Sequence, residues 1–142
     1  MPNRLIRDGI LNSPRYLSVS DSAGRLFIHL CLLADDLGCV DLDYTFIRRR
    51  AFDDAPAEER VIDLLVELID ADLLRQYHVD ARRYGFLPRF GQRLRILKLR
   101  HPHPPEALYA DDPDASAKFG KLRIADERRK EAAEARRKES GN

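Results

Sequence analysis

The sequence from residue 74 to residue 87 reads Leu74-Arg-Gln-Tyr-His-Val79, Asp80-Ala-Arg82 and Arg83-Tyr-Gly-Phe-Leu87. The first and last of these parts are rich in aromatic and aliphatic residues and read as two strands. The three residues between them are few enough for a tight connection, so the stretch predicts a β-hairpin. The hairpin follows directly on a long helical pattern, and the order of these two elements indicates the fold.

Three further elements precede that helix and hairpin. A helix is predicted from Ser20, a favourable N-cap, to Leu37, with Gly38 as its left-handed C-cap. The alternating segment 39–43 predicts a short strand, and 44–52 predicts a short helix. The second long helix is predicted from Ala57 to Leu74. Helix, short strand, helix, helix and hairpin is the order of a winged helix-turn-helix, with the hairpin as the wing and Ala57–Leu74 at the recognition position.

The sequence therefore predicts a mainly α fold with a small β-hairpin (α+β), that is, a winged helix-turn-helix followed by a basic, partly helical tail. We expect a winged-helix domain at 1–90, a basic and Pro-rich linker at 91–114 and a charged tail, helical or disordered, at 115–142. Residues 101–105, His-Pro-His-Pro-Pro, are typical of a polyproline II spacer. The tail helix is predicted to be weakly anchored, because its bulky apolar residues are limited to Phe119, Leu122 and Ile124.

Charge is abundant in the chain but nearly balanced. The 142 residues include 25 Lys and Arg and 24 Asp and Glu, for a net charge of +1. The balance hides an asymmetry, since residues 1–91 carry a net −3 and residues 92–142 a net +4. The sequence has no apolar run of membrane-spanning length and no apolar signal core at its start. We therefore expect no membrane association and a location in the cytoplasm.

Motifs for catalysis and for cofactors are absent from the sequence, so we predict neither an enzyme nor a bound cofactor or metal. Cys31 and Cys39 lack the spacing of a zinc site and are interpreted as buried structural thiols. The acidic residues at 35, 36, 41 and 43 match no calcium loop and are interpreted as solvated turn carboxylates. A metal at His101 and His103 is disfavoured by the neighbouring prolines.

Clusters of basic residues are the remaining functional signal. One lies at the end of the helix that precedes the recognition position, a second at the tip of the wing, and a third directly after the wing. Such groups can neutralise phosphates and release counterions, which predicts double-stranded DNA as a partner. The candidate DNA-binding residues are Arg48, Arg49, Arg50, Arg82, Arg83, Arg89, Arg93, Arg95, Lys98 and Arg100.

The helix at the recognition position is acidic, which argues against a simple transcription factor. Its carboxylates repel phosphates, so we expect DNA contact to use the preceding helix, the wing and the tail instead. The acidic helix is a candidate surface for a protein partner or for another copy of this chain. The candidate protein-binding residues are Glu58, Glu59, Asp63 and Glu67.

Several short segments, in order, resemble one known family. They are Arg4-Leu-Ile-Arg-Asp-Gly-Ile-Leu-Asn-Ser13, Tyr16-Leu-Ser18, Leu33-Ala-Asp-Asp-Leu-Gly-Cys-Val40, Leu73-Leu-Arg-Gln-Tyr77 and Tyr84-Gly-Phe-Leu87. Together they resemble the N-terminal winged-helix domain of phage replisome organisers, which are replication-initiation proteins, over about residues 3–100. The resemblance implies a winged helix that binds origin DNA and helps to recruit a replicative helicase or its loader.

The function predicted first is thus a non-enzymatic, phage-derived winged-helix protein of replication initiation. We expect no second folded helicase-interacting domain within these 142 residues. Two alternatives are therefore kept. One is a protein-interaction module, such as a phage accessory factor that inhibits a host protein, and the other is a transcriptional regulator.

Overall fold

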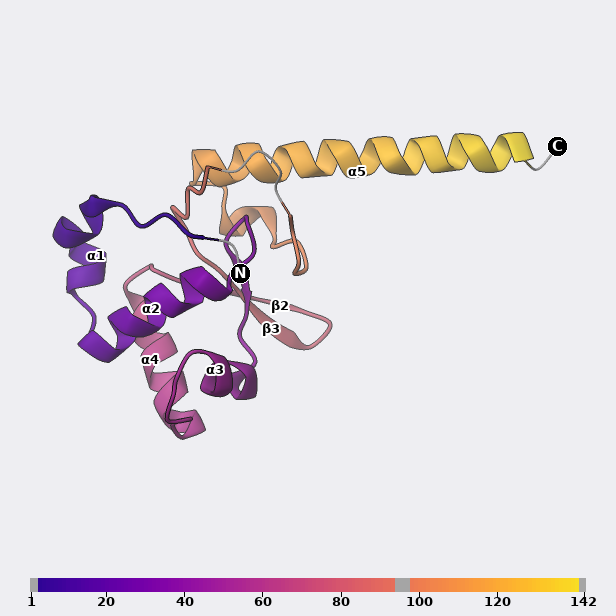
Figure 1. Ribbon diagram of the computed structural model, residues 1–142. Coiled ribbons are helices and arrows are strands. Elements are labelled where there is room, and N and C mark those ends of the chain that lie inside the picture. Colours follow the sequence, from indigo (N-terminus) through magenta and orange to yellow (C-terminus); the bar gives the residue numbers. More distant parts are fainter. Residues whose placement is uncertain (1–2, 94–97, 141–142) are drawn as a thin grey trace.

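A computed structural model describes residues 3–93 and 98–140 of the chain (Figure 1). The described residues form a mixed α+β fold with five α-helices and one small antiparallel sheet, which confirms the α+β class. In chain order the elements are the 3-10 helix η1 (Asp8–Asn12), α1 (Pro14–Leu17), α2 (Asp21–Leu33), β1 (Cys39–Asp41), α3 (Tyr44–Arg50), α4 (Glu58–Asp70), β2 (Arg75–Val79), β3 (Arg82–Phe86), the 3-10 helix η2 (Glu106–Leu108) and α5 (Pro113–Ser140).

The hairpin predicted from the sequence is present as β2 and β3. Asp80 and Ala81 connect the strands and have φ angles of 50° and 63°. Positive φ at both central residues is what a two-residue turn needs in order to match the twist of its strands. β1 pairs antiparallel with the free edge of β3, with Cys39 opposite Phe86, so that the strand order is β1-β3-β2. The hairpin is therefore extended to a sheet by a strand that lies more than 30 residues earlier.

One face of this sheet packs on α2, α3 and α4. Helices α2 and α4 contact each other, as do α3 and α4, and their apolar stripes meet at the sheet. Gly85 of β3 allows the close approach, because a Cβ at this position would lie 2.7 Å from Leu74 Cδ1 and 3.0 Å from Leu42 Cδ1. Val40 of β1 and three residues that directly flank the strands, Leu42, Leu74 and Leu87, belong to this first core.

Helix α2 begins as predicted but ends four residues earlier than Leu37. Ser20 Oγ accepts from Ala23 N–H at 3.2 Å, the expected N-cap. The helix stops at Leu33 because Asp35 organises a turn: its Oδ1 accepts from the N–H groups of Leu37 and Cys39. Gly38 has a φ of +90° inside this turn, so it is left-handed but is not the helix cap. The interpretation of Asp35 as a solvated carboxylate is wrong, since it is 1% exposed.

Helix α4 ends at Asp70, four residues before the predicted Leu74. The chain leaves the helix through a Schellman motif, in which Leu73 N–H donates to Leu68 C=O and Asp72 N–H donates to Ile69 C=O. Asp72 takes the left-handed position with a φ of 56°, where glycine is more usual. The apolar spacing continues past the end of the helix because Leu73 and Leu74 remain buried as the chain turns into β2.

The second face of the sheet is covered by the C-terminal part of the chain. Tyr77 Oη donates to Pro102 C=O at 2.6 Å, and the ring of Phe119 on α5 lies 6.1 Å from that of Phe86. The segment predicted as a spacer is thus packed on the sheet in its described residues. The buried members of this second core are Leu37, Cys39, Tyr77, Tyr84, Phe86, Tyr109, Ala115 and Phe119.

Helix α5 is anchored only by its first turns. Asp112 caps it by accepting from Ala115 N–H, and Phe119 is fully buried, whereas every residue from Asp126 to Ser140 is exposed. A helix of this length spans about 42 Å, and Figure 1 shows most of it extending away from the rest of the molecule. In the part of the chain that the structure describes, no helix is both long and apolar enough to cross a membrane.

Candidate nucleic-acid interface

The predicted DNA-binding residues are divided between two regions of the fold. Arg48, Arg49 and Arg50 form the last turn of α3, and Arg82 and Arg83 open β3 directly after the hairpin turn. The remaining predicted residues follow the hairpin in the sequence. Of these, Arg95 lies outside the described residues.

The hairpin meets α3 through a cation–π contact. The Arg83 guanidinium lies over the Tyr44 ring, 3.9 Å from its centroid, and its Nη1 donates to Leu42 C=O at 3.5 Å. Tyr44 is the first residue of α3, so this contact joins the hairpin to the helix that carries the three arginines. Arg83 is half-buried and positions the two elements, whereas Arg82 beside it is exposed.

We refer to Tyr44, Arg49, Arg50, Arg82 and Arg83 as the hairpin–α3 surface. Arg49 and Arg50 are exposed and lie one to two turns along α3 from the Tyr44–Arg83 contact. Among the described residues, no ion pair within 4.0 Å engages Arg49, Arg50 or Arg82. These guanidinium groups therefore keep their hydrogen-bond donors directed to solvent, where an anionic partner can reach them.

Two of the predicted DNA-binding arginines instead hold the fold together. Arg48 is half-buried, and its Nε donates to Pro56 C=O at 2.6 Å, which fixes the loop between α3 and α4. Arg89 Nη1 pairs with Asp72 Oδ2 at 3.2 Å, and Arg89 Nη2 donates to Asp72 C=O. The Schellman turn at the end of α4 is thereby tied to the chain that leaves β3.

Arg93, Lys98 and Arg100 have exposed side chains. The backbone N–H groups of Lys98 and Arg100 donate to Asp36 Oδ2 and Asp35 Oδ2, at 2.8 and 3.1 Å. These contacts hold the returning chain against the turn before β1 and leave the basic side chains on the outside. Asp35 and Asp36 therefore hold the chain at Lys98 and Arg100 in place through hydrogen bonds.

Asp72 gives the fold a pH-dependent ion pair that can be tested. The Arg75 guanidinium, assisted by Arg89, lowers the pKa of the Asp72 carboxyl from 3.8 to about 2. A lowered folded-state pKa contributes stability above the unfolded value, and that stability is lost as the pH falls toward the folded value. We expect the wild type to lose stability more steeply than Asp72→Asn between about pH 4 and pH 2, as measured by urea unfolding.

Asn is a suitable replacement for Asp72 because it tolerates the left-handed backbone conformation at this position. Parallel pH profiles of the two proteins would contradict the assignment, because the remaining carboxylates are common to both.

The acidic residues of α4 do not all face solvent in the same way. Glu58, Glu59 and Asp63 are exposed, as predicted for a docking surface. Glu67 is engaged: its two carboxylate oxygens accept from Ser20 N–H and Ser20 Oγ, both at 2.9 Å. Glu67 thus fastens the start of α2 to α4.

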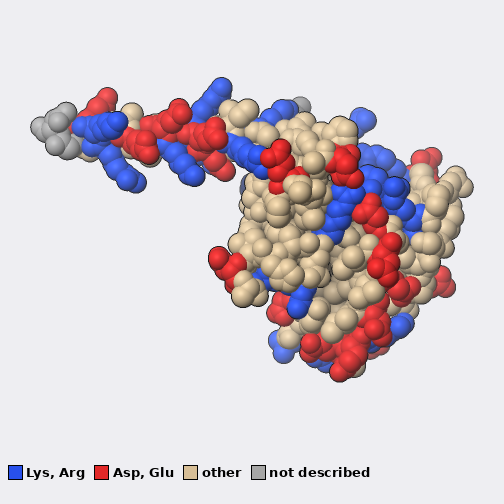
Figure 2. Space-filling model, turned by 180° about the vertical axis from the view of Figure 1, so that it is seen from behind, with Lys and Arg blue, Asp and Glu red and all other residues tan. Residues whose placement is uncertain are grey.

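Sequence reasoning missed two basic residues beside the segment that follows the hairpin. Arg7 donates to Gly91 C=O, and Lys118 on α5 donates to Gln92 C=O at 2.8 Å while pairing with Asp114. With Arg89 and Arg93 they line a wide hollow at the start of α5. Figure 2, which shows the molecule from behind, has a group of basic side chains on the globular part beside a band of acidic ones. Positions 7 and 118 are far apart in the sequence, so only the fold brings them together.

Groups that could hold a metal are not assembled in the described part of the chain, where no three His, Cys, Asp or Glu residues cluster. The two cysteines are buried and unbridged, as interpreted from the sequence, and burial raises the pKa of the Cys31 thiol to about 12. His103 packs edge-on against the Phe119 ring, with centroids 4.6 Å apart, and serves the second core. His101 instead lies against Tyr84.

Comparison with known proteins returned no match: no protein-family model, no curated protein and no solved structure matches the chain. The resemblance to phage replisome organisers therefore stays a prediction.

Proposed function

We propose that this chain is a winged-helix protein that binds double-stranded DNA through the hairpin–α3 surface. In this proposal β2 and β3 form the wing, and α4 stands at the recognition position. The protein acts by binding rather than by catalysis. Its place in replication initiation rests on the resemblance to phage replisome organisers and on nothing else.

The proposal is carried by one observation: the Arg83–Tyr44 contact brings the hairpin next to α3, with Arg49, Arg50 and Arg82 exposed and outside any described ion pair. Arginines that emerge from a wing and from an adjacent helix can contact phosphates on either side of a groove, and a wing arginine can enter the minor groove. The exposed carboxylates of α4 support the use of α3 and the hairpin, because an acidic helix in the major groove is repelled by the phosphates.

DNA binding is tested with the full chain and a labelled 30-base-pair duplex of arbitrary sequence, by fluorescence anisotropy. Neutralising the three exposed residues together (Arg49→Gln, Arg50→Gln, Arg82→Gln) is expected to weaken binding about tenfold. It should also reduce the slope of log affinity against log salt by roughly 2–3, since each lost phosphate contact removes about 0.9.

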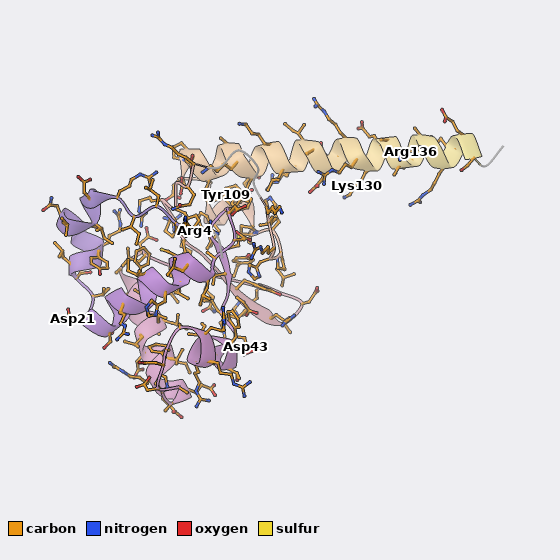
Figure 3. The ribbon with its side chains drawn as sticks, in the orientation of Figure 1. Arg4, Asp21, Asp43, Tyr109, Lys130 and Arg136 are labelled. Carbon is orange, nitrogen blue, oxygen red and sulfur yellow. The ribbon has the colours of Figure 1, made fainter. Side chains whose placement is uncertain are left out.

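The matched control is Arg136→Gln, Arg137→Gln, Lys138→Gln at the far end of α5. It makes the same change in net charge at exposed positions, and Figure 3 shows Arg136 on the projecting part of that helix. Its affinity is expected to stay within about threefold of the wild type. Equal losses of affinity in the two variants would contradict the proposed surface, because they would show a dependence on net charge alone. Absence of wild-type DNA binding at physiological salt would favour the protein-interaction alternative.

A further inference from the structure

The N-terminal segment of the chain is strapped across the first core. Arg4 donates to Ala34 C=O at 2.7 Å and to Cys31 C=O at 3.3 Å, and it pairs with Asp36. One residue later, Leu5 N–H donates to Gln92 Oε1, while Gln92 Nε2 donates to Leu5 C=O. Figure 1 shows the strap running from the middle of the molecule to α1 at its edge, and Figure 3 shows Arg4 beside α2. We call residues 4–17 the N-terminal strap.

A groove of 310 Å³ lies between this strap, α2 and the chain that follows β3. Its floor and walls are apolar and aromatic, and three arginines, Arg7, Arg15 and Arg89, are also among the lining residues. The described residues that line it include no Asp or Glu. Its apolar lining includes Ile6, Ile10, Phe27, Ile28 and Phe90.

The strap also exposes apolar side chains, and two of them, Leu5 and Ile6, line the groove. Leu5 and Ile6 are 52% and 47% exposed, and Leu11 and Leu17 are 73% and 64% exposed. Four large apolar residues within 13 positions that all face solvent are unusual for a segment without a partner. Elsewhere among the described residues the exposed large apolar side chains, Leu32, Val66 and Ile124, are isolated in sequence and lie on three different helices.

We propose that this groove binds an acidic amphipathic helix of a partner protein. The apolar face of such a helix would insert side chains between Ile6, Ile10 and Ile28, and its acidic flanks would meet Arg7 and Arg15. The groove volume is at the lower end of the roughly 300–1,000 Å³ of ligand pockets, so it takes a few side chains and leaves the rest of the helix to the exposed strap.

A second copy of the chain does not supply this occupant from its described residues. The acidic helix α4 buries its apolar stripe, including Val61, Leu64 and Leu68, in the first core. Val66 is the one large apolar side chain that this helix exposes. The projecting part of α5, from Arg123 to Ser140, carries seven basic and five acidic residues and is therefore net basic. Neither helix combines an accessible apolar face with acidic flanks.

The probe for this test is a labelled 18-residue helical peptide with Leu on one face and Glu on both flanks, and its counterpart has Lys in place of Glu. Fluorescence anisotropy with the full chain is expected to show at least about tenfold tighter binding of the Glu peptide. Ile6→Ser and Arg15→Glu should each weaken that binding about tenfold. Both residues are exposed, so the fold tolerates these changes.

The matched controls are Leu32→Ser and Arg25→Glu, which make the same chemical changes on α2 outside the groove lining. They are expected to bind within about threefold of the wild type. Equal binding of the two peptides, no binding of the Glu peptide, or equal losses in the controls would overturn the proposal. Self-association in sedimentation velocity that Ile6→Ser abolishes would also overturn it, since a second copy would then fill the groove. DNA binding, measured on the same variants, is independent of these outcomes.

Discussion

Replacing Asp35 by alanine is expected to lower the free energy of unfolding by about 3–5 kcal/mol. The carboxylate is buried, and it accepts three backbone N–H groups: Leu37 at 3.0 Å, Cys39 at 2.9 Å and Arg100 at 3.1 Å. Alanine leaves all three donors without their acceptor, and each unsatisfied buried donor costs about 1–3 kcal/mol. The loss also frees the chain at Arg100 from the turn before β1. Urea unfolding followed by circular dichroism measures the effect.

Asp53→Ala is the matched control for this variant, because Asp53 is exposed and the change should cost less than about 0.5 kcal/mol. Similar losses for the two variants would contradict the structural role of Asp35. The pH dependence gives a second readout. Burial raises the pKa of Asp35 above 3.8, so the folded protein holds this proton more tightly than the unfolded chain does.

The sign of this effect is opposite to that of Asp72. As the pH falls from the raised folded-state pKa toward the unfolded value of 3.8, protonation of Asp35 adds stability to the wild type. The three N–H donors favour the ionised carboxylate and reduce the size of the gain without reversing the direction. Asp35→Ala should lack this gain, so the difference in stability between wild type and variant widens over that interval.

The hairpin and its helices could be predicted from the sequence because their signals are local. The turn depends on the backbone angles of its own two residues, Asp80 and Ala81. The N-cap Ser20 lies three residues from the N–H group that donates to it. The ends of α2 and α4 could not be predicted in the same way. At Asp35 and Asp72 side-chain and backbone contacts stop the helix while the apolar spacing continues beyond it.

The covering of the second sheet face was missed, although the sequence does carry a signal for it. Tyr84-Gly-Phe-Leu87 is a continuous apolar run, and such a strand is typical of a sheet buried on both faces. The residues that cover this face could not be identified from the sequence, since Tyr109 and Phe119 are isolated in a charged, proline-rich sequence. Their burial arises from contacts with residues more than 20 positions earlier, such as Phe86.

The candidate site shows the same limit. Clustering in the sequence selected these arginines as a group but could not separate those without a described ion pair from those that hold the fold together. Arg82 and Arg89 look alike in the sequence, yet one faces solvent and the other pairs with Asp72. The difference depends on where a carboxylate arrives from another element, and that is a property of the tertiary fold.

Replacing Phe119 by alanine is expected to release α5 from the sheet and to lower the free energy of unfolding by about 3–5 kcal/mol. Phe119 is fully buried and contacts three rings: Tyr109 at 4.5 Å, His103 at 4.6 Å and Phe86 at 6.1 Å between centroids. Its removal leaves a cavity at the apolar anchor of the first turns of α5, and the described helix beyond these turns is exposed. Urea unfolding measures the loss, and Ile124→Ala on the exposed side of α5 should cost less than about 1 kcal/mol.

The two cysteines distinguish release of α5 from loss of the whole fold. Cys39 belongs to the second core together with Phe119, whereas Cys31 belongs to the first core with α2. Burial raises the pKa of both thiols, so the wild type should react slowly with a thiol reagent at either position. In Phe119→Ala, Cys39 is expected to react faster than Cys31, because uncovering the second face exposes Cys39 first. Equal acceleration at both cysteines would mean that the two cores open as one unit, and α5 would then be an integral part of the first core's stability.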